Sequence, residues 1–299
     1  MKSRRLAFFG VLLVAFGYAH AQDYAFKVLV NKGRNELKSG NNWQQLKVGL
    51  SLKSGDELKI SENSYLGLVH VSGKALELKQ SGSYKVGDLA SKVNGGSNVL
   101  NKYTDFILSS STTPKNRLAA TGAVDRGADN IQMYLPKPEL AVVYNDNVII
   151  QWDSQGAPAP YIVSFKSLFE DDLDRLETSE SSVAINLNSK NFANEDNITV
   201  EVSSGTNKNK VSNKYTLKKL SKADKARIKG ELEKIASTTS EQNALNKLLL
   251  AAFYEENNLL IDAGTAYAEA IQLAPDVPQY KEDYEAFLFR YGMKKAPAK

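Results

Sequence analysis

Residues 61–78 hold the residue types with the clearest potential for chemistry, a histidine and two glycines followed by a lysine. Gly67, Gly73 and Lys74 have the residue types of a phosphate-binding loop, in which backbone amides at the start of a helix hold phosphate oxygens. Such a loop requires four residues between the glycines and a serine or threonine after the lysine. Here five residues separate the glycines, and Ala75 follows the lysine. The sequence therefore predicts a tight hairpin turn at Gly73, between two strands.

His70 is the single histidine that follows residue 21. A metal site would need further imidazole, thiolate or carboxylate ligands, and a catalytic base would need a nucleophile and an orienting carboxylate. No such partners stand out in the sequence, which contains no cysteine. Because His70 shares its strand parity with Leu66 and Leu68, we expect it at the edge of a strand face that points to the core.

The acidic run at residues 170–174 is a second possible ligand set, and calcium is the ion it would suit. It lacks the glycine and the distal glutamate of a helical calcium loop, and the alternative is a solvated loop. Hydrolysis of a glycan would need two carboxylates at a fixed separation across a cleft, and no candidate pair stands out. We therefore predict that the protein is not an enzyme and uses no cofactor or metal ion.

Residues 1–21 have the pattern of a cleaved secretory signal peptide. Three basic residues precede an apolar run that ends at Ala19-His20-Ala21, and this run is shorter than the ~20 residues of a membrane-spanning helix. Cleavage would leave 35 basic and 34 acidic residues, a net charge of +1 instead of +4. This balance gives no reason to expect a nucleic-acid partner, and no later segment is apolar enough to span a membrane.

Residues 22–108 are expected to form an all-β domain, because short apolar runs alternate with polar residues and glycines break them at turns. The expected strands lie near residues 26–30, 46–48, 58–60, 66–68 and 76–78. Residues 109–138 are rich in Ser, Thr, Ala, Gly and Pro. We expect them to be a linker that is held in place near residues 131–135.

Residues 139–219 are expected to form a β-sandwich of fibronectin or immunoglobulin type, with Trp152 as an anchor of its core. The expected strands lie near residues 148–152, 161–165, 183–187, 198–202 and 214–217.

Residues 220–293 have helical periodicity and are expected to form four helices, followed by a short tail at 294–299. The expected helix boundaries are marked by Ser221, by Thr239 with Gln242 in the pattern of a capping box, by Pro275, by Pro278 and by Gly292.

The middle helix pair resembles a tetratricopeptide repeat. The small and large residues of that 34-residue pattern fall in order on Leu250, Ala251, Tyr254, Ala263, Tyr267, Ala270 and Pro275, while Lys247 stands at the usual tryptophan position. The resemblance implies stacked helical hairpins with a concave groove for a partner's peptide or helix. The candidate partner-binding residues are Tyr254, Tyr267, Tyr280 and Tyr284. The alternative is that these rings only pack the helices together.

The first β region resembles the FecR-like domain of bacterial envelope proteins. The resemblance rests on residues 43–49, 52–58 and 71–78, with Ser72 where an acidic residue usually precedes the hairpin glycine. It implies a periplasmic scaffold fold. The signalling regulators of that family also have an inner-membrane span and a cytoplasmic segment, which this sequence does not show, so no signalling activity is implied.

These features predict a multidomain chain, mainly β and then α, that is exported to the periplasm or to the outer membrane. We expect a non-catalytic envelope scaffold or adaptor that binds other envelope proteins through its helical tail and its β domains. The alternative is a module that binds cell-wall glycan, such as peptidoglycan, through exposed aromatic side chains of the β domains.

Overall fold

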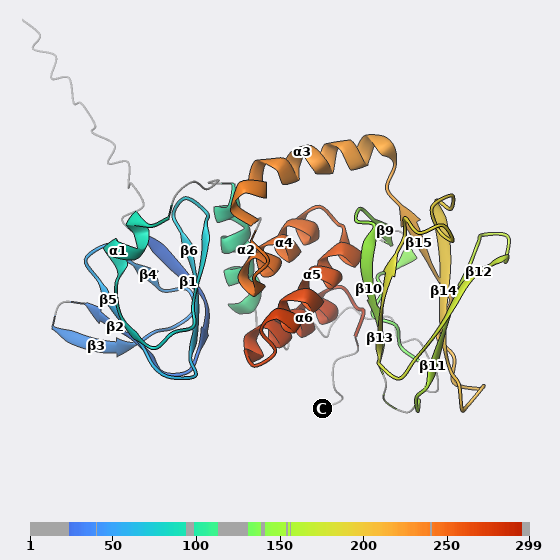
Figure 1. The fold of residues 1–299 in the computed structure, drawn as a ribbon, viewed down its shortest axis with the longest axis horizontal. Coiled ribbons are helices and arrows are strands. Elements are labelled where there is room, and N and C mark those ends of the chain that lie inside the picture. The colour runs from blue at the N-terminus through green and yellow to red at the C-terminus, as the bar shows by residue number, and fades with distance from the viewer. Residues whose placement is uncertain are drawn as a thin grey trace, which may run out of the picture.

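The computed structural model describes residues 24–39, 41–93, 99–112, 131–138, 141–153, 155, 157–239 and 241–294. The predicted signal peptide and most of the predicted linker lie outside these residues, as do residues 295–299 of the predicted tail. The expected order of β and then α is confirmed, since the β-rich part precedes four C-terminal helices. Figure 1 shows that these helices lie between two separate β regions, which we call the N-terminal and the second β region.

The N-terminal β region, residues 24–93, contains two four-stranded sheets. Its strands are β1 (Phe26–Lys32), β2 (Asn35–Ser39), β3 (Asn42–Gln45), β4 (Ser51–Leu52), β5 (Glu57–Ile60), β6 (Tyr65–His70), β7 (Ala75–Leu78) and β8 (Gly82–Lys85). One sheet has the order β4-β1-β6-β7, and the other has the order β3-β2-β5-β8. Their apolar side chains, among them Phe26, Leu58 and Leu68, form one core, and helix α1 (Val86–Ser91) follows β8.

The predicted hairpin at Gly73 is confirmed. Strands β6 and β7 pair in antiparallel register, and the His70 N–H donates to the carbonyl of Lys74 at 2.8 Å. Gly73 has a φ of +87°, the left-handed conformation that glycine adopts at low cost. His70 is half-buried and packs edge-on against Phe26, as expected for the end of a core-facing strand.

Two expectations for residues 22–108 were wrong. Residues 46–48 form no strand, and the region is not all-β, because residues 86–91 form α1 and residues 100–112 form helix α2 (Leu100–Thr112). Leu100, Tyr103 and Ile107 are buried at helical spacing, and they join the core of the C-terminal helices. The helix forms because this apolar stripe matches the 3.6-residue period, and α4 and α6 cover it.

The second β region contains all five predicted strands. Its strands are β9 (Val142–Val143), β10 (Asn147–Gln151), β11 (Tyr161–Lys166), β12 (Asp172–Thr178), β13 (Ser182–Asn186), β14 (Asn197–Ser204) and β15 (Tyr215–Lys219). A five-stranded sheet of order β12-β11-β14-β15-β9 shares one core with the β10-β13 pair. Trp152 is buried in this core with its ring 5.4 Å from that of Tyr161, which confirms its predicted role as an anchor.

The segment before β9 is held in place as predicted. Ile131, Met133 and Leu135 are buried in the same core, and Met133 forms a β-bridge with Trp152.

The four predicted helices are present as α3 (Lys222–Thr239), α4 (Ala244–Glu256), α5 (Leu260–Leu273) and α6 (Pro278–Arg290). Ser221 caps α3 by accepting from the Asp224 N–H at 3.1 Å. The capping box at Thr239 and Gln242 was wrong. Thr239 ends α3, and Asn243 caps α4 by accepting from the Asn246 N–H at 2.8 Å, because a cap must directly precede the first turn. Among the described residues, no helix combines the length and the apolarity that a membrane span requires.

The helices α4, α5 and α6 contact both β regions and are not a free tail. Leu29 of β1 and Tyr65 of β6 belong to the same apolar core as Leu245 and Tyr280. On the opposite side, Ile261 of α5 lies in the core of the second β region. We call α4, α5 and α6 the central helices.

The hairpin turn gives a first test of the fold. Replacing Gly73→Ala should lower the free energy of unfolding by about 1–2 kcal/mol, because a Cβ atom disfavours the left-handed conformation. Gly55→Ala is the matched control, since Gly55 has an ordinary φ and open space around its Cα. Urea denaturation measures both variants, and equal stabilities would contradict the assigned turn.

Candidate functional site

The side chains between the central helices and the two β regions form the most developed polar arrangement in the structure. Within the part of the chain that the structure describes, no group of three or more His, Cys, Asp or Glu side chains is placed to hold a metal ion. The candidate sites include these buried contacts, one small cavity between helices, and the exposed apolar side chains of the β regions.

The first set of contacts joins α6 to the N-terminal β region. The Tyr280 hydroxyl lies 2.6 Å from that of Tyr65, and both rings are buried. The Gln279 amide donates to the carbonyl of Leu29 at 2.8 Å and accepts from the Asn31 N–H at 3.3 Å. Because two of these partners are backbone groups of β1, the contacts fix the position of the strand itself against the helix.

The second set of contacts joins α5 to the loop between β9 and β10. The buried carboxylate of Asp262 accepts from the N–H groups of Tyr144 at 2.9 Å and Asn145 at 2.8 Å, and from the Asn145 amide at 2.8 Å. The Asn145 amide also donates to the Tyr254 hydroxyl at 3.0 Å. Burial raises the pKa of Asp262 to about 6, although the three donors act in the opposite direction.

Two further hydrogen bonds connect the central helices to β10. The Ile149 N–H donates to the Thr265 hydroxyl at 3.0 Å, and the Tyr284 hydroxyl donates to the side chain of Gln151. On the β10 edge that faces α5, the Thr265 hydroxyl thus accepts from a backbone N–H that would otherwise need a neighbouring strand as its partner.

A buried ion pair lies inside the helical region itself. The carboxylate of Glu255, with no exposed side-chain surface, lies 3.0 Å from the Arg290 guanidinium and accepts from the Tyr267 hydroxyl at 2.7 Å. Burial raises the pKa of Glu255, while the charge of Arg290 stabilises the ionised form. Both charged groups therefore have partners within the chain.

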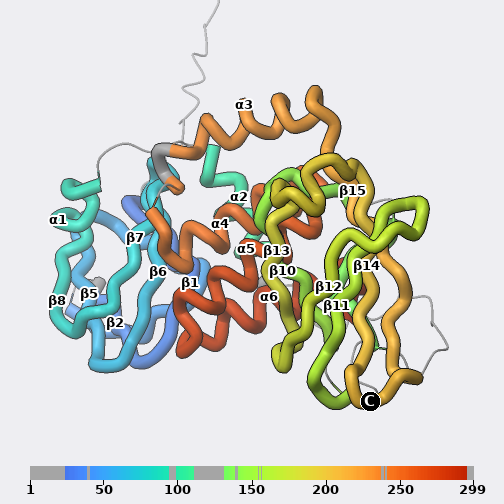
Figure 2. Tube along the Cα trace, turned by 45° about the vertical axis from the view of Figure 1, so that its right-hand side comes forward, coloured from blue at the N-terminus to red at the C-terminus, as the bar shows by residue number. Residues whose placement is uncertain are grey.

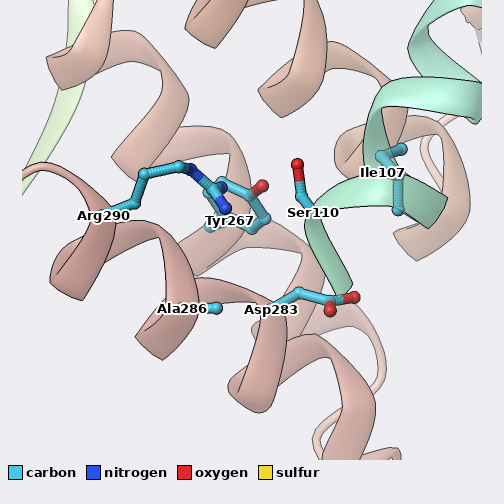
Figure 3. A pocket seen from close by; sticks show the side chains of 6 residues that line it. All are labelled: Ile107, Ser110, Tyr267, Asp283, Ala286 and Arg290. Atoms are coloured by element: carbon cyan, nitrogen blue, oxygen red, sulfur yellow. The ribbon is translucent and has the colours of Figure 1, made fainter. Parts of the chain in front are cut away.

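A small cavity lies beside Arg290 of this ion pair, and Figure 3 shows the side chains that line it. It is lined by Ile107, Ser110, Tyr267, Asp283, Ala286 and Arg290. Its volume is about 10 Å³, which is close to the space of one water molecule. The cavity is therefore too small for a substrate in this conformation.

All four tyrosines that the sequence suggested for partner binding are buried: Tyr254, Tyr267, Tyr280 and Tyr284. Their hydroxyl groups contact Asn145, Glu255, Tyr65 and Gln151 of the same chain. In this arrangement they connect the central helices to one another and to both β regions. A partner would have to contact other side chains.

The turn between β11 and β12 presents two exposed apolar side chains. Leu168 is 57% exposed and Phe169 is 90% exposed. The turn is well defined, because the Ser167 N–H donates to the Asp171 carbonyl at 2.9 Å and the Ser167 hydroxyl accepts from the Phe169 N–H at 3.1 Å. Lys214 forms an ion pair with Glu170 at 2.8 Å beside them. The structure thus holds Phe169 outward on a defined turn.

The acidic run at 170–174 lies in this turn and at the start of β12, where its first carboxylate faces Lys214 and Lys166. Leu168 and Phe169 stand between a strand and an acidic run, a sequence signal for an exposed apolar pair that the expectations above did not include.

A second exposed aromatic side chain lies on β3. Trp43 is 42% exposed, and the Lys38 ammonium lies 5.6 Å from the centre of its ring. All four residues of β3 are exposed, and the strand is the edge of its sheet.

Comparison with family models and with curated proteins finds no match for this chain. The two family resemblances therefore rest on the sequence motifs alone and stay predictions.

The buried carboxylate on α5 gives a test of the contacts between regions. Replacing Asp262→Ala should lower the free energy of unfolding by about 2–4 kcal/mol, because two backbone N–H groups lose their acceptor. Asp276→Ala is the control, because its carboxylate pairs with Lys32 while 71% exposed, and its loss should cost less than about 0.5 kcal/mol. Chemical denaturation measures the free energy of unfolding of both variants. An equal decrease in the two variants would show that the Asp262 contacts add no stability.

Proposed function

We propose that the protein is a non-catalytic scaffold or adaptor of the cell envelope, which holds partner proteins at fixed positions. The observation that carries this proposal is the pair of contact sets on the two sides of the central helices, around Tyr280 and around Asp262. They tie each β region to the helices through buried side chains. A chain built in this way presents two β surfaces at a constant distance from each other, as a scaffold requires.

The finer fold assignments belong to the same proposal. We infer a FecR-like domain in residues 22–108, a fibronectin-like or immunoglobulin-like sandwich in 139–219 and a tetratricopeptide-like arrangement in 220–293. The two-sheet core of each β region and the helical hairpin of α4 and α5 support these assignments. The N-terminal sequence pattern supports export, with the periplasm or the outer membrane as the destination.

The exposed side chains of the second β region are the best candidates for partner contact. Leu168 and Phe169 are apolar, adjacent and held outward by a hydrogen-bonded turn, so docking would order few additional side chains. Aromatic side chains also dominate the energetics of protein interfaces. The buried tyrosines of the central helices are then needed for the shape of the scaffold and not for direct contact.

Crosslinking and co-purification from the native envelope test this surface. The double variant Leu168→Ser with Phe169→Ser should reduce the recovery of crosslinked partners about tenfold, since apolar anchors contribute most of the binding energy. The control is Val48→Ser with Leu273→Ser, which removes two partly exposed apolar side chains elsewhere. Equal recovery with both double variants would contradict the assigned surface, and no specific partner with the unmodified protein would reject the scaffold proposal.

Binding of cell-wall glycan is the second candidate function, and the exposed ring of Trp43 favours it. An exposed indole offers a flat apolar face for a sugar ring, and Lys38 and the amide side chains of β3 offer hydrogen bonds around it.

A sedimentation assay with purified cell-wall sacculi tests the glycan alternative. Trp43→Ala should weaken binding about tenfold, whereas Trp43→Phe keeps an aromatic face and should retain most of it. If the unmodified protein does not sediment with sacculi, or if Trp43→Ala sediments equally well, the glycan alternative is rejected.

A further inference from the structure

A groove of about 620 Å³ lies beside β7 in the N-terminal β region. Its walls come from β7, from β8 with the adjoining helix α1, and from the segment before α4. Figure 2 shows α1, β8 and β7 next to one another in this region. The volume falls in the range of pockets that hold drug-sized or short peptide ligands.

One wall of the groove is a sheet edge with unused backbone groups. Strand β7 is the last strand of the order β4-β1-β6-β7. His70 and Lys74 form a hydrogen-bonded pair, and such pairs alternate with non-hydrogen-bonded pairs along an antiparallel ladder. The backbone hydrogen bonds from β7 to β6 therefore lie at Leu76 and Leu78. The backbone groups of Ala75 and Glu77 therefore point away from β6, and within the described residues no backbone partner takes them.

The floor of the groove is the opening between the two sheets of the N-terminal β region. Strand β8 is the terminal strand of the other sheet, so edges of both sheets border the groove. Leu78 and Leu89 are buried there, and Tyr84 and Val93 are partly buried against the same core. A strand added to β7 would direct every second side chain onto this apolar floor, because side chains alternate between faces.

The charges around the groove favour an acidic ligand. Three lysines and two glutamates line it, a net charge of +1. The carboxylate of Glu77 has little exposed surface and already accepts from the Leu245 N–H at 2.9 Å, at the start of α4. Lys79 is 56% exposed, and its ammonium lies 2.7 Å from the Glu77 carboxylate. Lys74 lies 3.8 Å from Glu241, which is 60% exposed. Lys92 is exposed and has no ion-pair partner among the described residues. A ligand carboxylate would therefore meet a lining with one excess positive charge, in which Lys92 is the cation without a carboxylate partner among the described residues.

We propose that β7 binds an extended acidic peptide segment of a partner protein as an additional strand of its sheet. The proposal rests on the scaffold function given above and specifies one kind of partner for it. The outward groups of Ala75 and Glu77 would supply backbone hydrogen bonds, and the floor at Leu89 would take apolar side chains at alternate positions. Lys79 and Lys92 would select acidic side chains at the remaining positions.

Fluorescence anisotropy with the full chain tests the charge requirement. The probe is a fluorescein-labelled peptide of sequence DVEVDVE, and its counterpart KVKVKVK is the control peptide. The acidic peptide should bind with a Kd on the order of 10–100 μM, and the basic peptide should bind at least tenfold more weakly. Lys79→Glu with Lys92→Glu should weaken the acidic peptide about tenfold. Lys190→Glu with Lys208→Glu, which changes the charge equally at exposed sites of the second β region, should leave it unchanged.

Residue-resolved hydrogen exchange tests the geometry. Saturation with the acidic peptide should slow exchange of the Ala75 and Glu77 amides at least tenfold, while the Leu76 and Leu78 amides, already bonded to β6, should change little. Absence of binding at ~1 mM peptide, or binding that leaves the Ala75 and Glu77 amides unprotected, would overturn the proposal.

The peptide-binding measurements and the recovery of envelope partners distinguish a failure of strand addition from a failure of the scaffold proposal. If the peptide does not bind β7 but envelope partners still depend on Leu168 and Phe169, strand addition is rejected and the scaffold remains. If the peptide binds β7 as described but no envelope partner is recovered, the strand site stands and the scaffold function is rejected.

Discussion

Helices α4 and α5 have apolar side chains on nearly every side. The need to bury these side chains is the constraint on which the rest of the structure depends. Ten of the 13 residues of α4 and nine of the 14 residues of α5 are buried. A helix of this kind is stable in water only when other elements cover it on all sides. Strands β1 and β6 cover one side, β9 and β10 cover another, and α2 and α6 complete the enclosure. With no cysteine in the chain, this burial has no disulfide to assist it.

Burial of apolar surface stabilises the contacts between the central helices and the β regions but does little to fix their relative orientation. The buried polar contacts fix that orientation. The Asp262 carboxylate is satisfied only when the backbone of Tyr144 and Asn145 lies at one position, and a shift of the second β region would leave these groups unpaired. The same holds for Gln279 against β1. Unpaired buried polar groups cost more than paired ones contribute, so such contacts act mainly by penalising other arrangements.

The elements that were predictable from sequence are those whose apolar period matches a single face. Strands such as β11 and β14 alternate strictly, and the hairpin at Gly73 has a turn glycine between two alternating runs. Helix α2 was missed because it follows a long glycine-marked β pattern, although Leu100, Tyr103 and Ile107 have helical spacing. The position of the central helices was missed for a different reason. Helical periodicity predicts one apolar stripe on each helix, whereas α4 and α5 also have buried apolar residues outside that stripe, and these require cover on the opposite side.

The same enclosure limits where a partner can bind. The central helices have little free surface, and β9 and β10 have contacts to α5 at Asp262 and Thr265. The remaining sheet edges differ in how they are protected. Strand β12 carries four charged side chains in seven residues, at positions 172, 174, 175 and 177, which disfavours pairing with another strand. In β7 the single charged side chain, Glu77, accepts from the Leu245 N–H at the start of α4, so it does not hinder pairing at the strand edge. Strand β7 is therefore less protected than β12 and also borders an open groove, and a scaffold that must accept a strand would keep such an edge uncovered.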